Sequence, residues 1–107
     1  IDLSNGNLRG INFNGVNLKN ANLKNSNLKD ANLQNVILKN ASLKGANLSG
    51  ANLKNSLLTG ANFRGSIFDN YCLSSIIESR EWEKAHFDQE VKEKLESMRV
   101  SKVGISL

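Results

Sequence analysis

Residues 21–55 read ANLKN SNLKD ANLQN VILKN ASLKG ANLSG ANLKN, which is seven five-residue units in one register. The same period runs without an insertion or deletion over fifteen units, from residue 1 to residue 75. The third residue of every unit is Leu or Phe. A period this strict says more about architecture than about function, because one scaffold can serve many roles.

Each position of the unit has its own chemistry. Position one is mostly Ala or Ser, position two is Asn in nine units, position four is Lys or Arg in eight, and position five is Gly or Asn in thirteen. An α-helix would spread a five-residue period over all its faces, whereas positions one and three share a side of an extended segment. Gly and Asn tolerate left-handed backbone best, so position five is predicted to form a corner.

Each unit is therefore predicted to be a short extended side, with positions one and three inside, followed by a turn. Such sides and corners close into coils, which stack at the strand spacing of about 4.8 Å. The resulting solenoid buries columns of position-three residues, and each unit contacts only its neighbours.

Three of the units, Ala21–Asn25, Ala46–Gly50 and Ala51–Asn55, resemble the pentapeptide-repeat family, whose pattern is Ala, Asp or Asn, Leu and two variable residues. The resemblance covers residues 1–75. It implies an all-β solenoid, a right-handed quadrilateral parallel β-helix with twenty residues per coil and about four coils. It also implies a bacterial source, with a plastid setting as the alternative.

The formal net charge of +4 is unevenly distributed. Residues 1–75 hold eight Lys or Arg and three Asp, whereas residues 76–107 hold six Lys or Arg and seven Asp or Glu. At twenty residues per coil, five basic residues should form a basic ridge around one corner: Lys19, Lys24, Lys39, Lys44 and Arg64. We interpret the ridge as a solvated face that keeps the protein soluble. The alternative is an anion or nucleic-acid contact, which is disfavoured because no outward aromatic residue accompanies the lysines.

Position two is apolar in four late units, where Asn is otherwise the rule: Ile37, Leu57, Ile67 and Cys72. Ile37, Leu57 and Ile67 form a candidate interaction patch, since contiguous exposed apolar residues usually mark contacts. Two alternatives stay open. The patch binds a partner or a second copy of the chain, or the C-terminal helix folds back and covers it.

The period stops at Ser75. Residues 76–99 lack Gly and Pro and are predicted to form a helical C-terminal cap, which begins with the capping box Ser75–Glu78. Trp82 and Phe87 are the predicted plug over the last coil, because an open solenoid end exposes a strand edge and an apolar column. Residues 100–107 are predicted to be a flexible end.

Catalytic chemistry is not indicated. The chain has one Cys, Cys72, and one His, His86, so neither a zinc set nor a nucleophile with an oriented base can be assembled. We expect no catalytic residue, no metal site and no cofactor. No run of about twenty apolar residues exists, so no membrane span is expected.

The sequence thus favours a non-enzymatic scaffold that binds a protein of unknown identity or a second copy of itself. A second hypothesis, suggested by the resemblance, is topoisomerase protection by mimicry of DNA. Mimicry needs an acidic surface, whereas this repeat region is basic. A third is anion or nucleic-acid binding by the basic ridge. The single cysteine suits a reducing compartment, so the cytoplasm is expected, with a plastid or the thylakoid lumen as the alternative. The period is already in register at Ile1, so we expect a fragment or a processed form.

Overall fold

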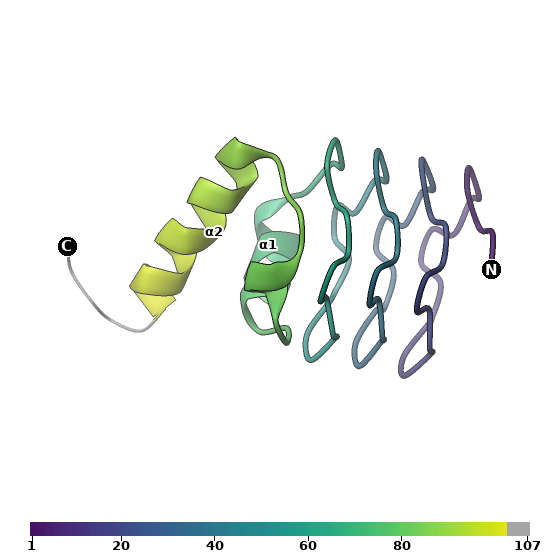
Figure 1. Ribbon diagram of the computed structural model, residues 1–107, viewed down its shortest axis with the longest axis horizontal. Coiled ribbons are helices and arrows are strands. Elements are labelled where there is room, and N and C mark those ends of the chain that lie inside the picture. Colours follow the sequence, from purple (N-terminus) through teal and green to yellow (C-terminus); the bar gives the residue numbers. More distant parts are fainter. Residues whose placement is uncertain (103–107) are drawn as a thin grey trace.

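A computed structural model describes residues 1–102 as a stack of backbone coils followed by helices. The helices are α1 (Asn70–Ile77), a 3₁₀ helix (Trp82–Lys84) and α2 (Gln89–Lys102). The coils run along the long axis of the molecule and the helices stand at its C-terminal end (Figure 1). No helix in this part of the chain is long and apolar enough to cross a membrane.

Parallel bridges between neighbouring coils set the register of the stack. Almost all of them join residues twenty positions apart, as in Asn17 to Ile37 and Ile37 to Leu57. Four columns of position-two residues result, so that each coil has four sides. Each side pairs through one isolated bridge to the coil before and after it, because only three residues separate the corners. The prediction of a repeat β-helix is confirmed in this form, with single-residue rungs in place of longer strands.

Position five forms the corners, as predicted. Its Asn and Gly residues adopt left-handed backbone, for example φ 58° at Asn25 and φ 75° at Gly50. Asp30, the one Asp at this position, does the same with φ 61°. Left-handed backbone costs Asn and Asp less free energy than other L-residues, and it costs Gly almost none.

Position two has a structural role that the sequence reasoning missed. In most units its Asn side chain accepts a hydrogen bond from the backbone amide two residues later, as from Lys24 to Asn22 at 3.1 Å and from Lys54 to Asn52 at 3.0 Å. In these units the side-chain turn closes the corner from outside. Asn at position two is therefore a turn-forming residue as well as a solvent-facing one.

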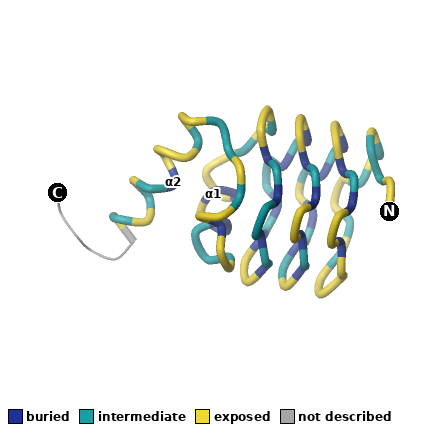
Figure 2. The backbone as a smooth tube through the Cα atoms, in the orientation of Figure 1, coloured by how far each residue is buried: buried dark blue, intermediate teal, exposed yellow. Residues whose placement is uncertain are grey.

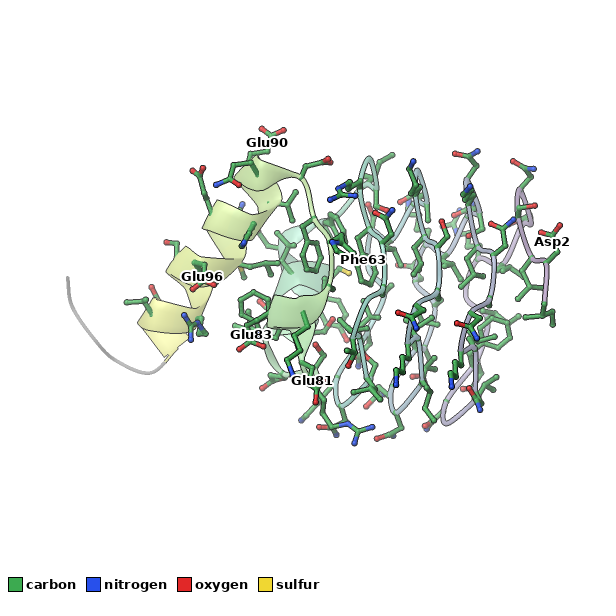
Figure 3. The ribbon with its side chains drawn as sticks, viewed as in Figure 1. Asp2, Phe63, Glu81, Glu83, Glu90 and Glu96 are labelled. Carbon is green, nitrogen blue, oxygen red and sulfur yellow. The ribbon has the colours of Figure 1, made fainter. Side chains whose placement is uncertain are left out.

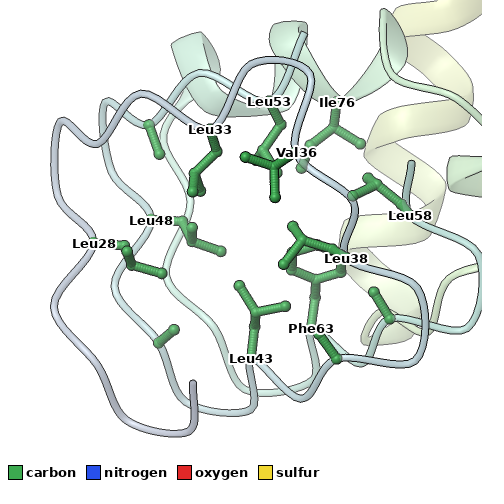
Figure 4. Packing of buried hydrophobic residues seen from close by; sticks show 14 of the residues in the cluster. Leu28, Leu33, Val36, Leu38, Leu43, Leu48, Leu53, Leu58, Phe63 and Ile76 are labelled. Carbon is green, nitrogen blue, oxygen red and sulfur yellow. The ribbon is translucent and has the colours of Figure 1, made fainter. Parts of the chain in front are cut away.

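The core lies inside the coils and consists of positions one and three (Figure 2). Leucines from the four sides point at one another, with small Ala residues between them (Figure 4). In all three units where Ser replaces Ala at position one, its hydroxyl donates to a backbone carbonyl. Ser66 donates to Leu43 in the coil below at 2.6 Å, and the other two donate to the carbonyl three residues earlier. Ser26 donates to Leu23 at 2.7 Å, and Ser56 donates to Leu53 at 2.6 Å. The buried hydroxyls are thereby satisfied.

The predicted boundary at residue 75 is wrong. Coil geometry ends at Phe68, and α1 begins at Asn70 with Asp69 as its N-cap, whose side chain accepts from the Cys72 amide at 2.9 Å. The fifteenth unit, residues 71–75, is therefore helical, although its sequence still has Leu at position three. Its position-one residue is Tyr71, which is too large for the inward place that Ala fills elsewhere and is 57% exposed.

The predicted capping box at Ser75–Glu78 is also wrong, since Ser75 lies inside α1. Its hydroxyl accepts from the Leu53 amide at 2.9 Å and donates to the Cys72 carbonyl at 2.6 Å. Of the predicted flexible end at 100–107, residues 100–102 belong to α2. Residues 103–107 lie outside the described part of the chain.

We predict that Leu38→Ala lowers the free energy of unfolding by about 2 to 5 kcal/mol, because Leu38 is fully buried among facing leucines. Leu8→Ala is the matched control: Leu8 lies in the first coil and is only half-buried, so its loss should be smaller. Urea denaturation followed by circular dichroism measures both. Equal losses would contradict the burial gradient along the stack.

Candidate functional site

The predicted apolar patch is divided between two opposite walls. Ile37 and Leu57 are bridged to one another and stack on one wall, in the column that Asn17 begins and Arg80 ends. Ile67 belongs to the column of Asn27 and Asn47. Figure 4 shows the inner leucines of these two columns, Leu38 and Leu58 against Leu28 and Leu48, on opposite sides of the core. The three-residue patch is thus corrected to an Ile37–Leu57 wall and a separate Ile67.

Ile37 and Leu57 are both half-buried on this wall. Unlike Asn, they cannot close the corner through a side-chain oxygen, so the Lys39 amide, two residues after Ile37, has no such bond. α1 and α2 stand at the end of the stack and not along this wall (Figure 1). The alternative in which the C-terminal helix covers the patch is therefore not what the structure adopts.

The five residues of the predicted basic ridge lie on two adjacent sides of the coils. Lys24, Lys44 and Arg64 follow one another up one side, joined through the backbone by Asn25 donating to Lys44 at 2.9 Å and Gly45 donating to Arg64 at 3.1 Å. Lys19 and Lys39 rise up the adjacent side. All five ridge residues are exposed, and none belongs to an ion pair among residues 1–102.

An acidic group interrupts the ridge at its C-terminal end. Above Lys39 in its column stands Thr59, whose hydroxyl donates to the Glu81 carboxylate at 2.7 Å. This hydrogen bond, with Lys84 nearby, lowers the pKa of Glu81. Other acidic residues, Glu83, Glu90 and Glu96, lie on the helical end (Figure 3). The net positive charge of the chain thus lies on the coils, whereas the helical end has nearly equal numbers of basic and acidic residues.

The segment after Phe68, which we call the C-terminal segment, continues the backbone pairing of the last coil. Arg80 donates to Ser56 at 2.7 Å and accepts from Leu58 at 3.0 Å, and His86 donates to Ala61 and accepts from Phe63, both at 2.8 Å. Each of these residues repeats the pattern that position two makes in the coils. Non-repeat sequence therefore satisfies strand edges that the end of the solenoid would otherwise expose.

Both predicted plug residues pack against the end of the stack. The Phe87 ring stacks on Phe63 with centroids 5.1 Å apart and planes 4° apart, and Phe68 tilts against both. Phe63 lies where the last coil meets this segment (Figure 3). Trp82 is buried, with the Arg99 guanidinium 6.0 Å from its ring centroid. Aromatic burial of this kind anchors α2 and the preceding segment to the coils.

The two residues considered for chemistry differ in their surroundings. Cys72 is buried in α1, and burial raises the pKa of its thiol. His86 is exposed and acts through its backbone. Within residues 1–102 no three His, Cys, Asp or Glu side chains are grouped so as to hold a metal ion.

A sequence profile described as "Pentapeptide repeats" matches the chain in eight copies, over residues 1–35, 26–65 and 37–74. The comparison with curated proteins gives no significant match. Among solved structures, full-length QnrB1, a plasmid-mediated fluoroquinolone resistance protein, superposes with a TM-score of 0.68 and 18% identity, over 95% of this chain and 44% of that one. This chain thus spans less than half of QnrB1, and the likeness at that identity is one of fold.

Two further pentapeptide repeat proteins are more similar in sequence. Rfr23 from the cyanobacterium Cyanothece 51142 is 28% identical over 81% of this chain and 54% of its own, with a TM-score of 0.41. A protein from the Arabidopsis thaliana thylakoid lumen is 35% identical over 64% of this chain and 52% of its own, with a TM-score of 0.37.

We predict that Phe87→Ala lowers the free energy of unfolding by about 2 to 4 kcal/mol and loosens the helical end, because it removes the ring stacked on Phe63. His86→Ala is the control, since its backbone pairing survives the change. Thermal unfolding and amide hydrogen exchange of α2 report both effects. A loss from His86→Ala as large as that from Phe87→Ala would contradict the aromatic anchor.

We predict that Cys72 in the folded protein resists alkylation by iodoacetamide at pH 8 and reacts readily in urea. Its raised pKa also has a consequence for stability. Above the ordinary thiol pKa of about 8.5 the unfolded chain loses this proton and the folded chain keeps it, so stability should fall as pH rises. Cys72→Ala should weaken that fall. Rapid alkylation of the folded protein would contradict the buried thiol.

Proposed function

The chain belongs to the pentapeptide-repeat family, and from that premise we propose that it is a non-enzymatic protein-interaction scaffold. The observation that carries the proposal is the Ile37–Leu57 wall, where two apolar side chains stand in adjacent coils at positions that Asn otherwise occupies. Rigid coils hold the two side chains in fixed register, so they offer a partner a preorganised surface. The proposed partner is another protein, with a second copy of this chain as the alternative.

The proposal includes the remaining features of the architecture. The coil is proposed to be right-handed and quadrilateral as in the family, and the segment after Phe68 to act as a cap that keeps the solenoid from pairing end to end. The cytoplasm is the proposed compartment, because the buried Cys72 requires no oxidising environment. A plastid or the thylakoid lumen is the alternative.

Topoisomerase protection as a DNA mimic is disfavoured by charge. A mimic must present acid where a DNA-binding surface is basic. The coils of this chain instead carry the exposed basic ridge, and most of their position-two residues are Asn rather than Asp. The acidic residues gather at the helical end, away from the regular walls.

We predict that Ile37→Asn with Leu57→Asn abolishes or weakens at least tenfold the capture of a protein partner or the self-association of the chain. Asn occupies this position in nine units and closes the corner, so the double variant should fold. Ile1→Asn, the same change at an exposed residue of the first coil, is the control and should keep the complex. Affinity capture and analytical ultracentrifugation measure the result. An unchanged partner set and assembly state would refute the Ile37–Leu57 wall as an interface.

Binding of nucleic acid through the basic ridge is the alternative that salt tests directly. We predict no saturable binding of duplex DNA at about 50 mM salt, where phosphate contacts are strong. Fluorescence anisotropy with a labelled duplex measures it, and Lys24→Gln with Lys44→Gln is the matched variant. The contradicting result is binding that weakens steeply as salt is raised and that is lost in this variant. The role of the ridge would then be nucleic-acid binding and not solubility.

A further inference from the structure

The C-terminal segment pairs with three of the four sides of the last coil and leaves the fourth unpaired. Leu58 donates to Arg80, Phe63 donates to His86, and Leu53 donates to the Ser75 hydroxyl. On the fourth side, neither the Phe68 amide nor the Ser66 carbonyl has a hydrogen-bond partner within residues 1–102. We call residues 66–68 the open edge.

The path of the chain explains why this edge stays open. After pairing over Phe63, the chain reaches Asp88, whose carboxylate accepts from the Gly65 amide at 2.8 Å. α2 then begins at Gln89, so the residues that would lie over Phe68 in a continuing coil are helical. In the coil below, the corresponding groups are paired, with Leu48 donating to Ile67 and Ile67 donating to Ala46.

A groove of about 420 Å³ lies beside the open edge, between the last coil and α2. Its volume falls in the range of ordinary ligand pockets, about 300 to 1,000 Å³. Its apolar residues are Ile67 and Phe68 of the last coil, Leu73 of α1 and Val91 of α2. Its charged residues, Glu90 and Lys94, both belong to α2. Ile67 is 55% exposed there. An unpaired donor and acceptor thus border an apolar groove.

We propose that the open edge binds an extended peptide segment of a partner protein, which adds one rung parallel to Ser66–Phe68. The central residue of the peptide donates its amide to the Ser66 carbonyl and accepts from the Phe68 amide. The residues on either side of it point inward, into the groove. This is strand addition to an exposed sheet edge, in which backbone bonds give affinity and alternate side chains give specificity.

The chain itself supplies the pattern that such a peptide should have. In Ala85–His86–Phe87 the central residue makes both backbone bonds, to Ala61 and Phe63, and Phe87 enters the stack. The proposed ligand therefore reads small, any residue, large apolar. The final large residue would reach the lining of Phe68, Leu73 and Val91.

A single strand fits this edge better than the other candidates. A second copy would present a whole four-sided coil, which meets the C-terminal segment on the other three sides. A nucleic-acid phosphate can accept from Phe68 but cannot donate to Ser66, and Glu90, which lines the groove, repels it. Glu90 and Lys94 balance one another in charge, and neither belongs to an ion pair within the described chain. This balance suits a peptide of mixed charge.

The proposal rests on the interaction function but concerns a surface other than the Ile37–Leu57 wall. The test uses the ¹⁵N-labelled full chain and a blocked synthetic peptide with the sequence of residues 83–89, EKAHFDQ. We expect saturable shifts of the Ile67, Phe68 and Val91 amides. The same peptide with a methyl group on its His amide cannot donate to Ser66 and should bind at least about tenfold more weakly.

Variants of the protein supply the second arm. Val91→Glu places a charge in the groove and should abolish the shifts, whereas Lys92→Gln, which changes net charge equally from a neighbouring position on α2, should leave them unchanged. No saturable shift, shifts centred on Phe63, or equal affinity for the methylated peptide would each overturn the proposal. Because purified protein and a defined peptide are used, such a failure leaves the test of the Ile37–Leu57 wall unaffected.

Discussion

Backbone hydrogen bonds between neighbouring coils hold the stack together, and they place residues twenty positions apart beside one another. Each side of a coil is only three residues long between its corners and has no regular pairing of its own. It gains its bonds from the coils on either side, and Ile37, for example, donates to Val16 and accepts from Leu18 in the coil before it. A five-residue unit that failed to turn at its last residue would shift every later rung. This explains why left-handed Asn, Gly or Asp is found at one corner after another.

Because each coil depends on its neighbours, the two ends of the stack differ from its middle. The last coil has no further coil beyond it, so other residues must supply its hydrogen-bond partners and cover its core. Arg80 and His86 provide the pairing, Phe87 stacks on Phe63, and Trp82 is buried in the core cluster. The C-terminal segment achieves this on three sides and then departs as α2. Completion of the solenoid and the open edge at Ser66–Phe68 thus arise from one chain path.

The residues that depart from the repeat pattern have different structural roles, and residue type alone does not distinguish these roles. Ile37, Leu57 and Ile67 look alike as apolar residues at position two, yet only the first two share a wall. Counting in steps of twenty from Ile37 reaches Leu57, and the same count places Ile67 with Asn47. Tyr71 and Asp69 also look like tolerated variations of the period. Together they end it, because one is too large to point inward and the other caps a helix.

The coil, its corners, its buried columns and the alignment of basic residues in steps of twenty can all be predicted from the amino-acid sequence. All of these follow from residue preferences that repeat every five residues, and such a local pattern is visible in the sequence. Packing sets the residue at which coiling stops, the sides with which the C-terminal segment pairs, and the edge that stays open. These depend on whether Tyr71 fits inside, how Phe87 meets Phe63, and where Asp88 turns the chain into α2. Such contacts join residues with no common period, and only the packed chain brings them together.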